Sequence, residues 1–293
     1  MALVRAFLFI FLFFFEGYAF FRDPFPSGFS MADMGTIFWQ NGIRGRQPWT
    51  PAAFMNDSLV FGIACGYTSF YAQMDNFSDL RISRVLGGLW YSSKRLKIKT
   101  ALSFFNVLSM YGEQTGAISL GVDVFRFLRI SGDFYATRSR LFILPERSES
   151  IVETGLSILI PFKRVAISTS LEHIPIWKSR RDKVTTDFTI RSGVHTVANQ
   201  FGAQGFIIEV VPEQQRPLRL ILGEEVFLTQ WFSLRASVST NPCFIGIGVT
   251  VEFKGGFADV SLVNNSDLGW SQGFSSAYGI RRQKKMQGNN CCP

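Results

Sequence analysis

The sequence has few of the residues that bind metals or carry out catalysis. Its 293 residues include only two His and four Cys, and no two Cys have the spacing of a zinc site. The phosphate-binding pattern Gly-x-x-x-x-Gly-Lys is absent as well. We therefore expect no cofactor, no metal and no catalytic residue, and we predict that the protein is not an enzyme.

The four cysteines are isolated or terminal. Cys65 and Cys243 each stand alone in an apolar segment, which is typical of a small buried hydrophobic residue. Cys291 and Cys292 are adjacent at the C-terminal end, where they are either tail residues or partners in an intermolecular disulfide.

Long apolar runs are also missing from the interior of the chain. Hydrophobic residues make up 47% of the sequence, yet no internal run reaches the roughly 18–20 apolar residues of a membrane-spanning helix. Apolar residues instead alternate with small or polar ones, as in 118–124 and 245–253. Because side chains on a strand point alternately to opposite faces, this period predicts strands with one apolar face.

The alternation recurs along the chain and predicts about 12–14 strands. The clearest run extends from Pro217 to Ile280 and contains five segments separated by turns. The charged stretch 174–183 is predicted to be one of the longest connections. The other predicted strands lie at about 59–68, 80–92, 95–107, 115–125, 127–140, 150–161, 163–173, 184–192 and 201–211.

Two architectures fit many short antiparallel strands: an outer-membrane barrel and a secreted β-sandwich. The polar faces of the segments are rich in Gly, Ser, Ala and Thr, which suits a barrel lumen. Large aromatic residues mark segment ends, as the girdles of a membrane barrel do. The girdle candidates are Trp90, Tyr91, Trp231, Phe232, Trp270 and Tyr278. We predict an all-β, antiparallel transmembrane β-barrel with a short N-terminal plug segment, and keep the sandwich binding module as the alternative.

The N-terminus has the features of a signal peptide. Arg5 precedes an apolar core, 6–15, and Ala19 follows as the expected cleavage position. The period is absent from 20–56, where prolines exclude long regular elements. We predict a signal peptide at 1–19, a plug or arm at 20–56, a barrel at 57–281 and a basic tail at 282–293. Export by a cleaved signal peptide places the protein in the cell outer membrane.

Three stretches resemble a known family. Ser30–Gly35, followed by Thr50-Pro51-Ala52-Ala53-Phe54, resembles the N-terminal pattern of the fatty-acid-transporter-like outer-membrane barrels, with Thr50 at the usual Asn position. Ser233–Phe253 and Leu268–Ile280 resemble a hairpin and the closing strand of the branch related to type IX secretion outer-membrane proteins (PorV/PorQ-like). Here the closing strand is followed by a basic tail, 281–293.

The resemblance implies a passage for a small hydrophobic ligand or a non-enzymatic component of an envelope or secretion assembly. It also implies that the N-terminal segment enters the barrel, and we predict that Met31–Phe54 packs inward. The expected plug residues are Met31, Met34, Trp39, Pro51 and Phe54. By alternation alone, the expected lumen-facing residues are Arg219, Glu225, Arg235, Glu252 and Asp259.

The net charge bears on the partners of the protein, and the two histidines are the remaining candidates for chemistry. Part of the net charge of +8 lies in turns and in the tail. These basic residues either form a solvated rim or contact anionic lipid head groups. The expected partners are outer-membrane lipid and either a hydrophobic small molecule or secretion-system proteins, with no nucleic acid. Alternation gives His173 only Thr169 as a same-face neighbour, and His195 lies near Ser192 and Thr196 in a region without clear period.

Overall fold

The structure is a computed structural model and describes residues 51–55, 59–70, 82–107, 111–141, 148–179, 188–196, 201–210, 218–240, 243–265 and 269–281. Within these residues lie a short 3-10 helix, η2 (Ala52–Phe54), and fourteen strands. The strands are β1 (Leu59–Phe70), β2 (Ile82–Ser92), β3 (Leu96–Val107), β4 (Tyr111–Phe125), β5 (Leu128–Leu141), β6 (Ser148–Pro161), β7 (Val165–Lys178), β8 (Thr189–Thr196), β9 (Gly202–Val210), β10 (Arg219–Phe227), β11 (Phe232–Ser239), β12 (Phe244–Phe253), β13 (Gly256–Asn265) and β14 (Gly269–Arg281).

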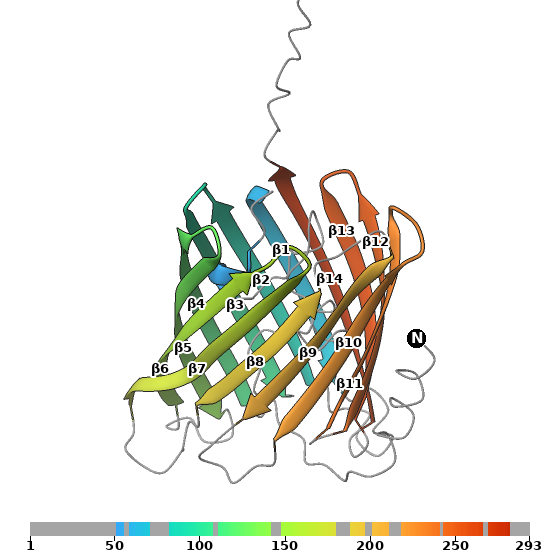
Figure 1. The fold of residues 1–293 in the computed structure, drawn as a ribbon. Coiled ribbons are helices and arrows are strands. Elements are labelled where there is room, and N and C mark those ends of the chain that lie inside the picture. The colour runs from blue at the N-terminus through green and yellow to red at the C-terminus, as the bar shows by residue number, and fades with distance from the viewer. Residues whose placement is uncertain are drawn as a thin grey trace, which may run out of the picture.

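The fourteen strands form one closed antiparallel barrel (Figure 1). Each strand pairs with its neighbours in the sequence, and β1 pairs with β14 to close the sheet. The predicted barrel and strand number are thus confirmed, and the sandwich alternative is wrong, because the described strands make a single closed sheet. The predicted segments 1–19, 282–293 and most of 20–56 lie outside the described residues.

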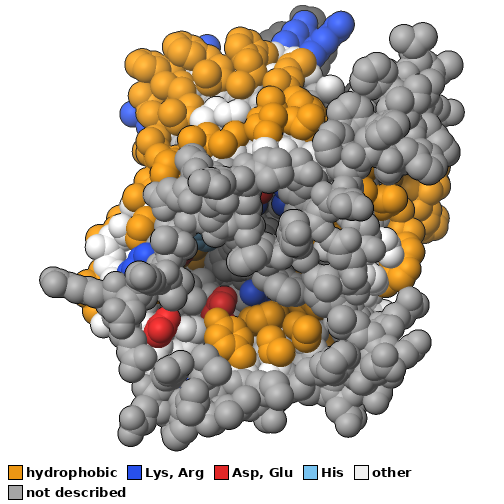
Figure 2. All heavy atoms as spheres, turned by 90° about the horizontal axis from the view of Figure 1, so that it is seen from below, with side chains coloured by type: hydrophobic (Ala, Val, Ile, Leu, Met, Phe, Trp, Pro, Cys, Tyr) orange, Lys and Arg blue, Asp and Glu red, His pale blue; other side chains and the backbone are white. Residues whose placement is uncertain are grey.

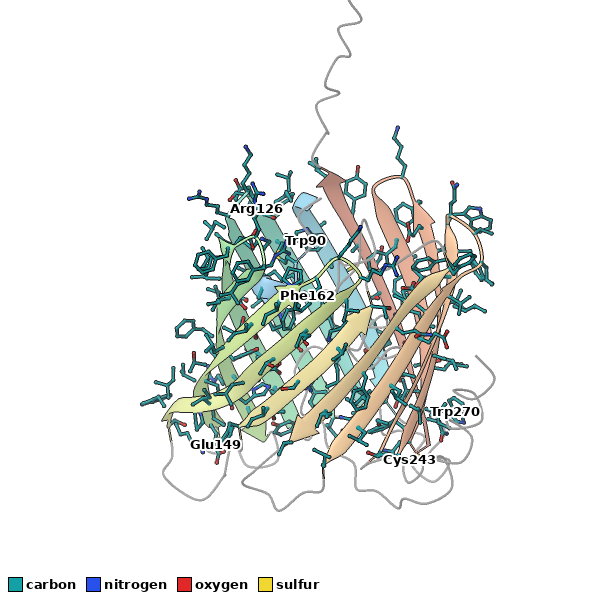
Figure 3. All side chains as sticks on the ribbon, viewed as in Figure 1. Trp90, Arg126, Glu149, Phe162, Cys243 and Trp270 are labelled. Atoms are coloured by element: carbon teal, nitrogen blue, oxygen red, sulfur yellow. The ribbon has the colours of Figure 1, made fainter. Side chains whose placement is uncertain are left out.

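The two ends of the barrel differ in their connections. At one end, neighbouring strands are joined by short turns such as 93–95, 126–127 and 254–255. The start of β1 and the end of β14 lie at this end too (Figure 1). The opposite end is the long-connection end, where longer stretches of sequence separate the end of one strand from the start of the next, as between Phe70 and Ile82 or between Lys178 and Thr189. Figure 3 places Arg126 at the short-turn end and Glu149, Cys243 and Trp270 at the other.

Because apolar and polar residues alternate along each strand, the outer and inner faces of the barrel wall differ in character. On β12, Ile245, Ile247 and Val249 are exposed on the outside, whereas Gly246 and Gly248 are buried on the inside. The other strands repeat this pattern, so the outer face is an apolar band and the inner face carries small, polar and charged side chains. Among the described residues, no helix is long and apolar enough to cross a membrane.

Strand β7 is longer than the sequence predicted. It continues to Lys178, so half of the stretch 174–183, which was expected to be a connection, is strand. The pairing with β6 slips on both sides of Thr154, and His173 has a φ of 62°. The strand therefore passes through a β-bulge, which absorbs residues that a regular period of two cannot accommodate.

Two other predictions about side-chain position are wrong. Trp90 was expected in an aromatic girdle, but it points inward with only 3% of its surface exposed. It shares the parity of Leu86 on β2, which is also buried. Cys65 was expected to be buried, but it is exposed on the outer face of β1. In contrast, Tyr91, Trp231 and Tyr278 are exposed, in keeping with a girdle.

Candidate functional site: the barrel lumen

The candidate site is the lumen, where charged side chains are concentrated. Figure 2, seen from the end with the long connections, shows hydrophobic side chains on the outer rim and acidic and basic side chains within the ring. Charged groups avoid an apolar environment unless they are paired or hydrogen-bonded, so their position on the inner face separates a polar interior from an apolar exterior. Apart from the pair between Arg84 and Glu113 at 3.8 Å, the ion pairs of the described residues fall into three groups along the wall.

The first group lies on β10–β13 and includes three of the five residues predicted to face the lumen. Glu225, Arg235 and Asp259 are 1%, 2% and 1% exposed. Arg235 forms an ion pair with Asp259 across β12, where its neighbour is Gly248. Because Gly248 has no side chain, the guanidinium reaches the next strand but one.

Hydroxyl groups complete this network. The Ser233 hydroxyl donates a 2.6 Å hydrogen bond to Glu225, and the Thr250 hydroxyl donates a 2.7 Å bond to Asp259. Glu252, also predicted to face the lumen, shares the parity of Thr250 and is half-buried. Hydrogen bonds to ionised groups are stronger than neutral ones, so these hydroxyls hold the carboxylates in place.

The second group is a ladder of alternating charges toward the long-connection end of β7–β10. Arg191 on β8 binds Glu172 on β7 at 3.4 Å and Glu209 on β9 at 2.7 Å. Arg219 on β10, the fifth residue predicted to face the lumen, lies 3.6 Å from the other oxygen of Glu209 and contacts the ring of Phe244. Each charge of the ladder has a neighbour of opposite sign, so the ladder adds little net field to the lumen.

The β-bulge of β7 extends this ladder toward β6. His173 Nδ1 lies 3.0 Å from Glu153, and its ring packs on Tyr135 at 5.0 Å between centroids. Glu153 and Tyr135 face inward, so His173 does too, on the same side as its neighbour Glu172. The prediction that His173 lies on the opposite face, next to Thr169, is therefore wrong, because it assumed an unbroken period of two.

The third group lies near the short-turn end and contacts the segment 51–55. Asp123 accepts ion pairs from Lys97 at 2.5 Å and Arg129 at 3.3 Å. Arg129 also donates a 2.9 Å hydrogen bond to the carbonyl oxygen of Met55. The amide of Ala52 donates a 2.7 Å bond to the Ser119 hydroxyl. The segment is thus hydrogen-bonded to side chains of both β4 and β5.

Residues 51–55 contact widely separated parts of the inner wall. One apolar cluster joins Ala52 and Met55 to Ala64, Trp90, Phe257 and Ala277 on β1, β2, β13 and β14. A second cluster joins Ala53 and Phe54 to Leu159, Ala166, Ile207 and Ile221 on β6, β7, β9 and β10. The segment lies closest to β3–β6, and its two clusters extend from there to strands on either side.

Close packing surrounds this segment. A Cβ added at Gly121 of β4 would lie 2.9 Å from the carbonyl carbon of Ala52, closer than side chains tolerate. Two of the predicted plug residues, Pro51 and Phe54, belong to the segment and are buried. The other three, Met31, Met34 and Trp39, lie outside the described residues, so the plug as a whole stays a prediction.

Sequence reasoning missed one polar contact in the lumen. The Ser168 hydroxyl lies 2.8 Å from His195 Nε2, and both residues are buried. The contact joins β7 to β8, and it depends on a strand register that the sequence of the intervening connection does not reveal. His195 lies on β8, within regular strand. The neighbours expected for it, Ser192 and Thr196, form contacts of their own with Thr169 and Gln204.

A motif associated with hydrolases is also present in an unsuitable context. Residues 269–273 read Gly-Trp-Ser-Gln-Gly and match the nucleophile pattern Gly-x-Ser-x-Gly. That pattern marks a nucleophile only at a sharp turn from strand to helix, whereas Ser271 lies within strand β14. Among the described residues, no group of three or more His, Cys, Asp or Glu is arranged to hold a metal ion.

Comparisons with known proteins identify similar structures but no family. No model of a protein family matches the sequence, and no curated protein matches it. The structure of the CymD monoaromatic hydrocarbon channel superposes with a TM-score of 0.65 at 9% identity, covering 90% of this chain and 100% of that one. At this identity the likeness shows a shared fold.

Other solved structures superpose more loosely. The outer membrane protein Omp33 of Acinetobacter baumannii gives a TM-score of 0.49 at 9% identity, covering 77% of this chain and 100% of that one. A mutant of the Rh. blastica porin gives 0.44 at 8% identity, covering 76% and 99%.

Proposed function

We propose that this protein is an outer-membrane β-barrel that passes a small hydrophobic ligand, and that residues 51–55 close its lumen. The outer face supports the membrane location, because it is an apolar band on a sheet that has no free edge. Only closed barrels and helices satisfy every backbone polar group in hydrocarbon. In bacterial barrels the short turns face the periplasm, which orients the segment 51–55 toward that side.

The observation that carries the proposed ligand class is the apolar contact around 51–55. Most of the inner wall is polar, but two clusters of apolar side chains contact this segment. A small hydrophobic molecule in the lumen would find its complementary surface there. The fold shared with a monoaromatic hydrocarbon channel supports the same ligand class.

Dye uptake tests the passage directly. The barrel would be expressed in cells whose outer leaflet is lipopolysaccharide, which excludes the apolar dye N-phenyl-1-naphthylamine, and entry of the dye would be followed by fluorescence. We expect Phe54→Ala to raise the uptake rate several-fold, because it removes the ring by which the segment 51–55 contacts its second apolar cluster. Phe274→Ala is the matched control, since Phe274 is 47% exposed on the outer face. Uptake equal to that of cells without the barrel, in every variant, would exclude a passage for this class of ligand.

The predicted plug has a separate test. If Met31–Phe54 folds into the lumen, trypsin should spare the bonds after Arg44 and Arg46 in the folded barrel in detergent. An arm outside the barrel would be cut at once. Heated, unfolded protein is the control, because both bonds are then accessible.

A role as a non-enzymatic component of an envelope or secretion assembly is the second candidate. It is favoured by the resemblance of Ser233–Phe253 to the hairpin of secretion-related barrels, a stretch that forms β11 and β12. Loss of secreted proteins from the culture medium in a deletion strain, with no change in dye uptake, would favour this role over the passage.

A further inference from the structure

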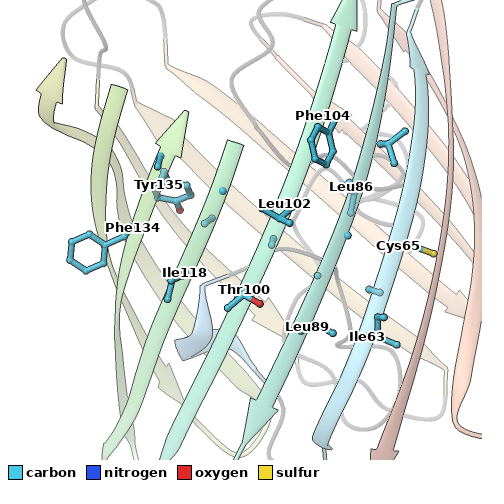
Figure 4. Close-up of a pocket in the computed structure, with 18 of the residues that line it drawn as sticks. Ile63, Cys65, Leu86, Leu89, Thr100, Leu102, Phe104, Ile118, Phe134 and Tyr135 are labelled. Atoms are coloured by element: carbon cyan, nitrogen blue, oxygen red, sulfur yellow. The ribbon is translucent and has the colours of Figure 1, made fainter. Parts of the chain in front are cut away.

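The outer face of the barrel has a hollow over β1–β5 (Figure 4). Its volume is about 890 Å³, and its lining includes Ile63, Leu89, Leu102, Phe104, Ile118 and Phe134, all exposed on the outside. Most of its lining residues face outward, and the remaining ones, such as Ala64, Leu86 and Tyr135, face inward from the same strands. The hollow therefore opens to the exterior, and its volume lies within the range of about 300–1,000 Å³ of small-molecule sites.

Small outward residues create the hollow. Cys65, Gly87, Gly116 and Ala136 lie on one line of paired residues that crosses β1–β5, with Leu102 between the two glycines. A Cβ at Gly87 would meet nothing nearer than 3.9 Å, and a Cβ at Gly116 nothing nearer than 3.6 Å. These glycines are not required by backbone packing, so larger residues there would fill the hollow without disturbing the sheet.

The second observation is the charge of the turns beside the hollow. Lys94 and Arg95 form the β2–β3 turn, Arg126 forms the β4–β5 turn, and all three are exposed. The amide of Asp123 donates a 3.0 Å hydrogen bond to the carbonyl oxygen of Arg95, so the two turns are adjacent. None of the three cations forms an ion pair with a described residue. Figure 3 shows Arg126 at the short-turn end of the barrel.

Exposed aromatic rings lie beside one of these cations. Phe125 and Phe127 flank Arg126 and stack on each other with centroids 5.3 Å apart. Both are more than half exposed, at 56% and 60%. Aromatic rings favour the boundary between lipid tails and head groups, which places the cations at the level of the lipid phosphates.

We propose that the hollow and these two turns form a binding site for one anionic phospholipid. An acyl chain fills the hollow, and the phosphate pairs with Lys94, Arg95 and Arg126. The spacing fits: Leu89 lies about 10 Å before the end of β2 at Ser92, at roughly 3.3 Å per residue, which is within the half-thickness of about 15 Å of a bilayer hydrocarbon core. The site rests on the proposed membrane location and adds a specific lipid to it.

Native mass spectrometry of the detergent-solubilised barrel tests the site, with phosphatidylglycerol as the probe. We expect phosphatidylglycerol occupancy to fall at least about fivefold in Lys94→Gln/Arg95→Gln, since each cation near a lipid surface contributes about a factor of five. The matched control is Lys163→Gln/Arg164→Gln in the β6–β7 turn, which removes the same charge away from the hollow and should leave occupancy unchanged. Phosphatidylcholine, which has no net charge, should bind more weakly to the wild type.

A second set of variants tests the hollow independently of the cations. Gly87→Leu/Gly116→Leu should lower phosphatidylglycerol occupancy to a similar extent, whereas Ala236→Leu, on the outer face of β11, should not. Folding of each variant is checked by its altered gel migration on heating. Equal occupancy in all variants, equal loss in the controls, or preference for lipopolysaccharide would overturn the site. Recovery of the wild type as a soluble protein would overturn the membrane location as well. Failure of the lipid site alone can therefore be distinguished from failure of the proposed membrane location.

Discussion

Two sectors of the barrel wall line the lumen with different kinds of side chain. The sector formed by β12–β14 and β1 lines the lumen largely with small side chains, and its alternation is regular over most of its length. The sector formed by β6–β10 lines it with the charge ladder and is interrupted by a β-bulge. The first depends on close approach of small residues, and the second on the pairing of buried charges. The two should therefore respond to different kinds of substitution.

The largest effect is expected on the outer face of the regular sector. Ile247→Arg places a cation on the apolar band of β12, where Ile247 is 46% exposed. Arg at the level of the bilayer centre costs about 2–4 kcal/mol. We expect little heat-modifiable barrel in the membrane fraction, measured by gel migration. Ile247→Ala is the control, and normal assembly of the Arg variant would mean that this face does not meet lipid.

A substitution on the inner face of the same sector should be nearly as harmful. A Cβ at Gly62 would lie 2.1 Å from Trp90 and 2.7 Å from the carbonyl oxygen of Tyr278. Gly62→Val should lower the free energy of unfolding by about 1–3 kcal/mol through overpacking. Urea unfolding in detergent measures the change. The double variant with Trp90→Ala should recover only part of the loss, because the clash with the backbone oxygen remains.

In the charged sector, the sensitive residue is the central cation of the ladder. Arg191→Met leaves Glu172 without its 3.4 Å partner and Glu209 without its 2.7 Å partner. An unsatisfied buried group costs about 1–3 kcal/mol, and Arg219 still pairs with Glu209, so we expect the lower half of that range. The urea midpoint should fall without a change in slope. An unchanged midpoint would mean that the ladder contributes no net stability.

The smallest effect is expected where a buried hydroxyl has no partner. Ser261 on β13 is 1% exposed, and its hydroxyl makes no hydrogen bond with the described residues. Ser261→Ala should change the free energy of unfolding by less than about 0.5 kcal/mol, because no interaction is lost. The comparison with Arg191→Met uses the same urea assay. A loss as large as that of Arg191→Met would mean that this hydroxyl has a structural role.

The contrast between the sectors also explains what could be predicted from the sequence. In the regular sector, a period of two is sufficient to assign Ile247 and Gly248 to opposite faces, and the structure places them so. The same rule fails for His173, because a bulge with a positive φ turns the side chain to the face of Glu172. A bulge arises from the pairing of two strands, so no single residue type in the sequence predicts it.

The register between neighbouring strands is the second feature that could not be predicted from the sequence. The contact between Ser168 and His195 and the reach of Arg235 to Asp259 both depend on which residues of neighbouring strands lie side by side. Alternation defines faces within a strand but not the offset between strands. Trp90 was predicted to lie in an aromatic girdle, but it shares the inward parity of Leu86, so alternation along the strand outweighs the preference of aromatic residues for membrane interfaces.

The seam between β1 and β14 has a consequence for how the chain reaches this structure. Phe61 pairs with Ile280, so the hydrogen bonds that remove the last free edges join the beginning of the barrel to its end. Every other strand pairs with a neighbour in the sequence and can form hairpin by hairpin. Contacts between distant parts of a chain are entropically costly and slow folding. Closure of this seam should therefore be the rate-limiting step, and until it occurs both edge strands can pair with other chains.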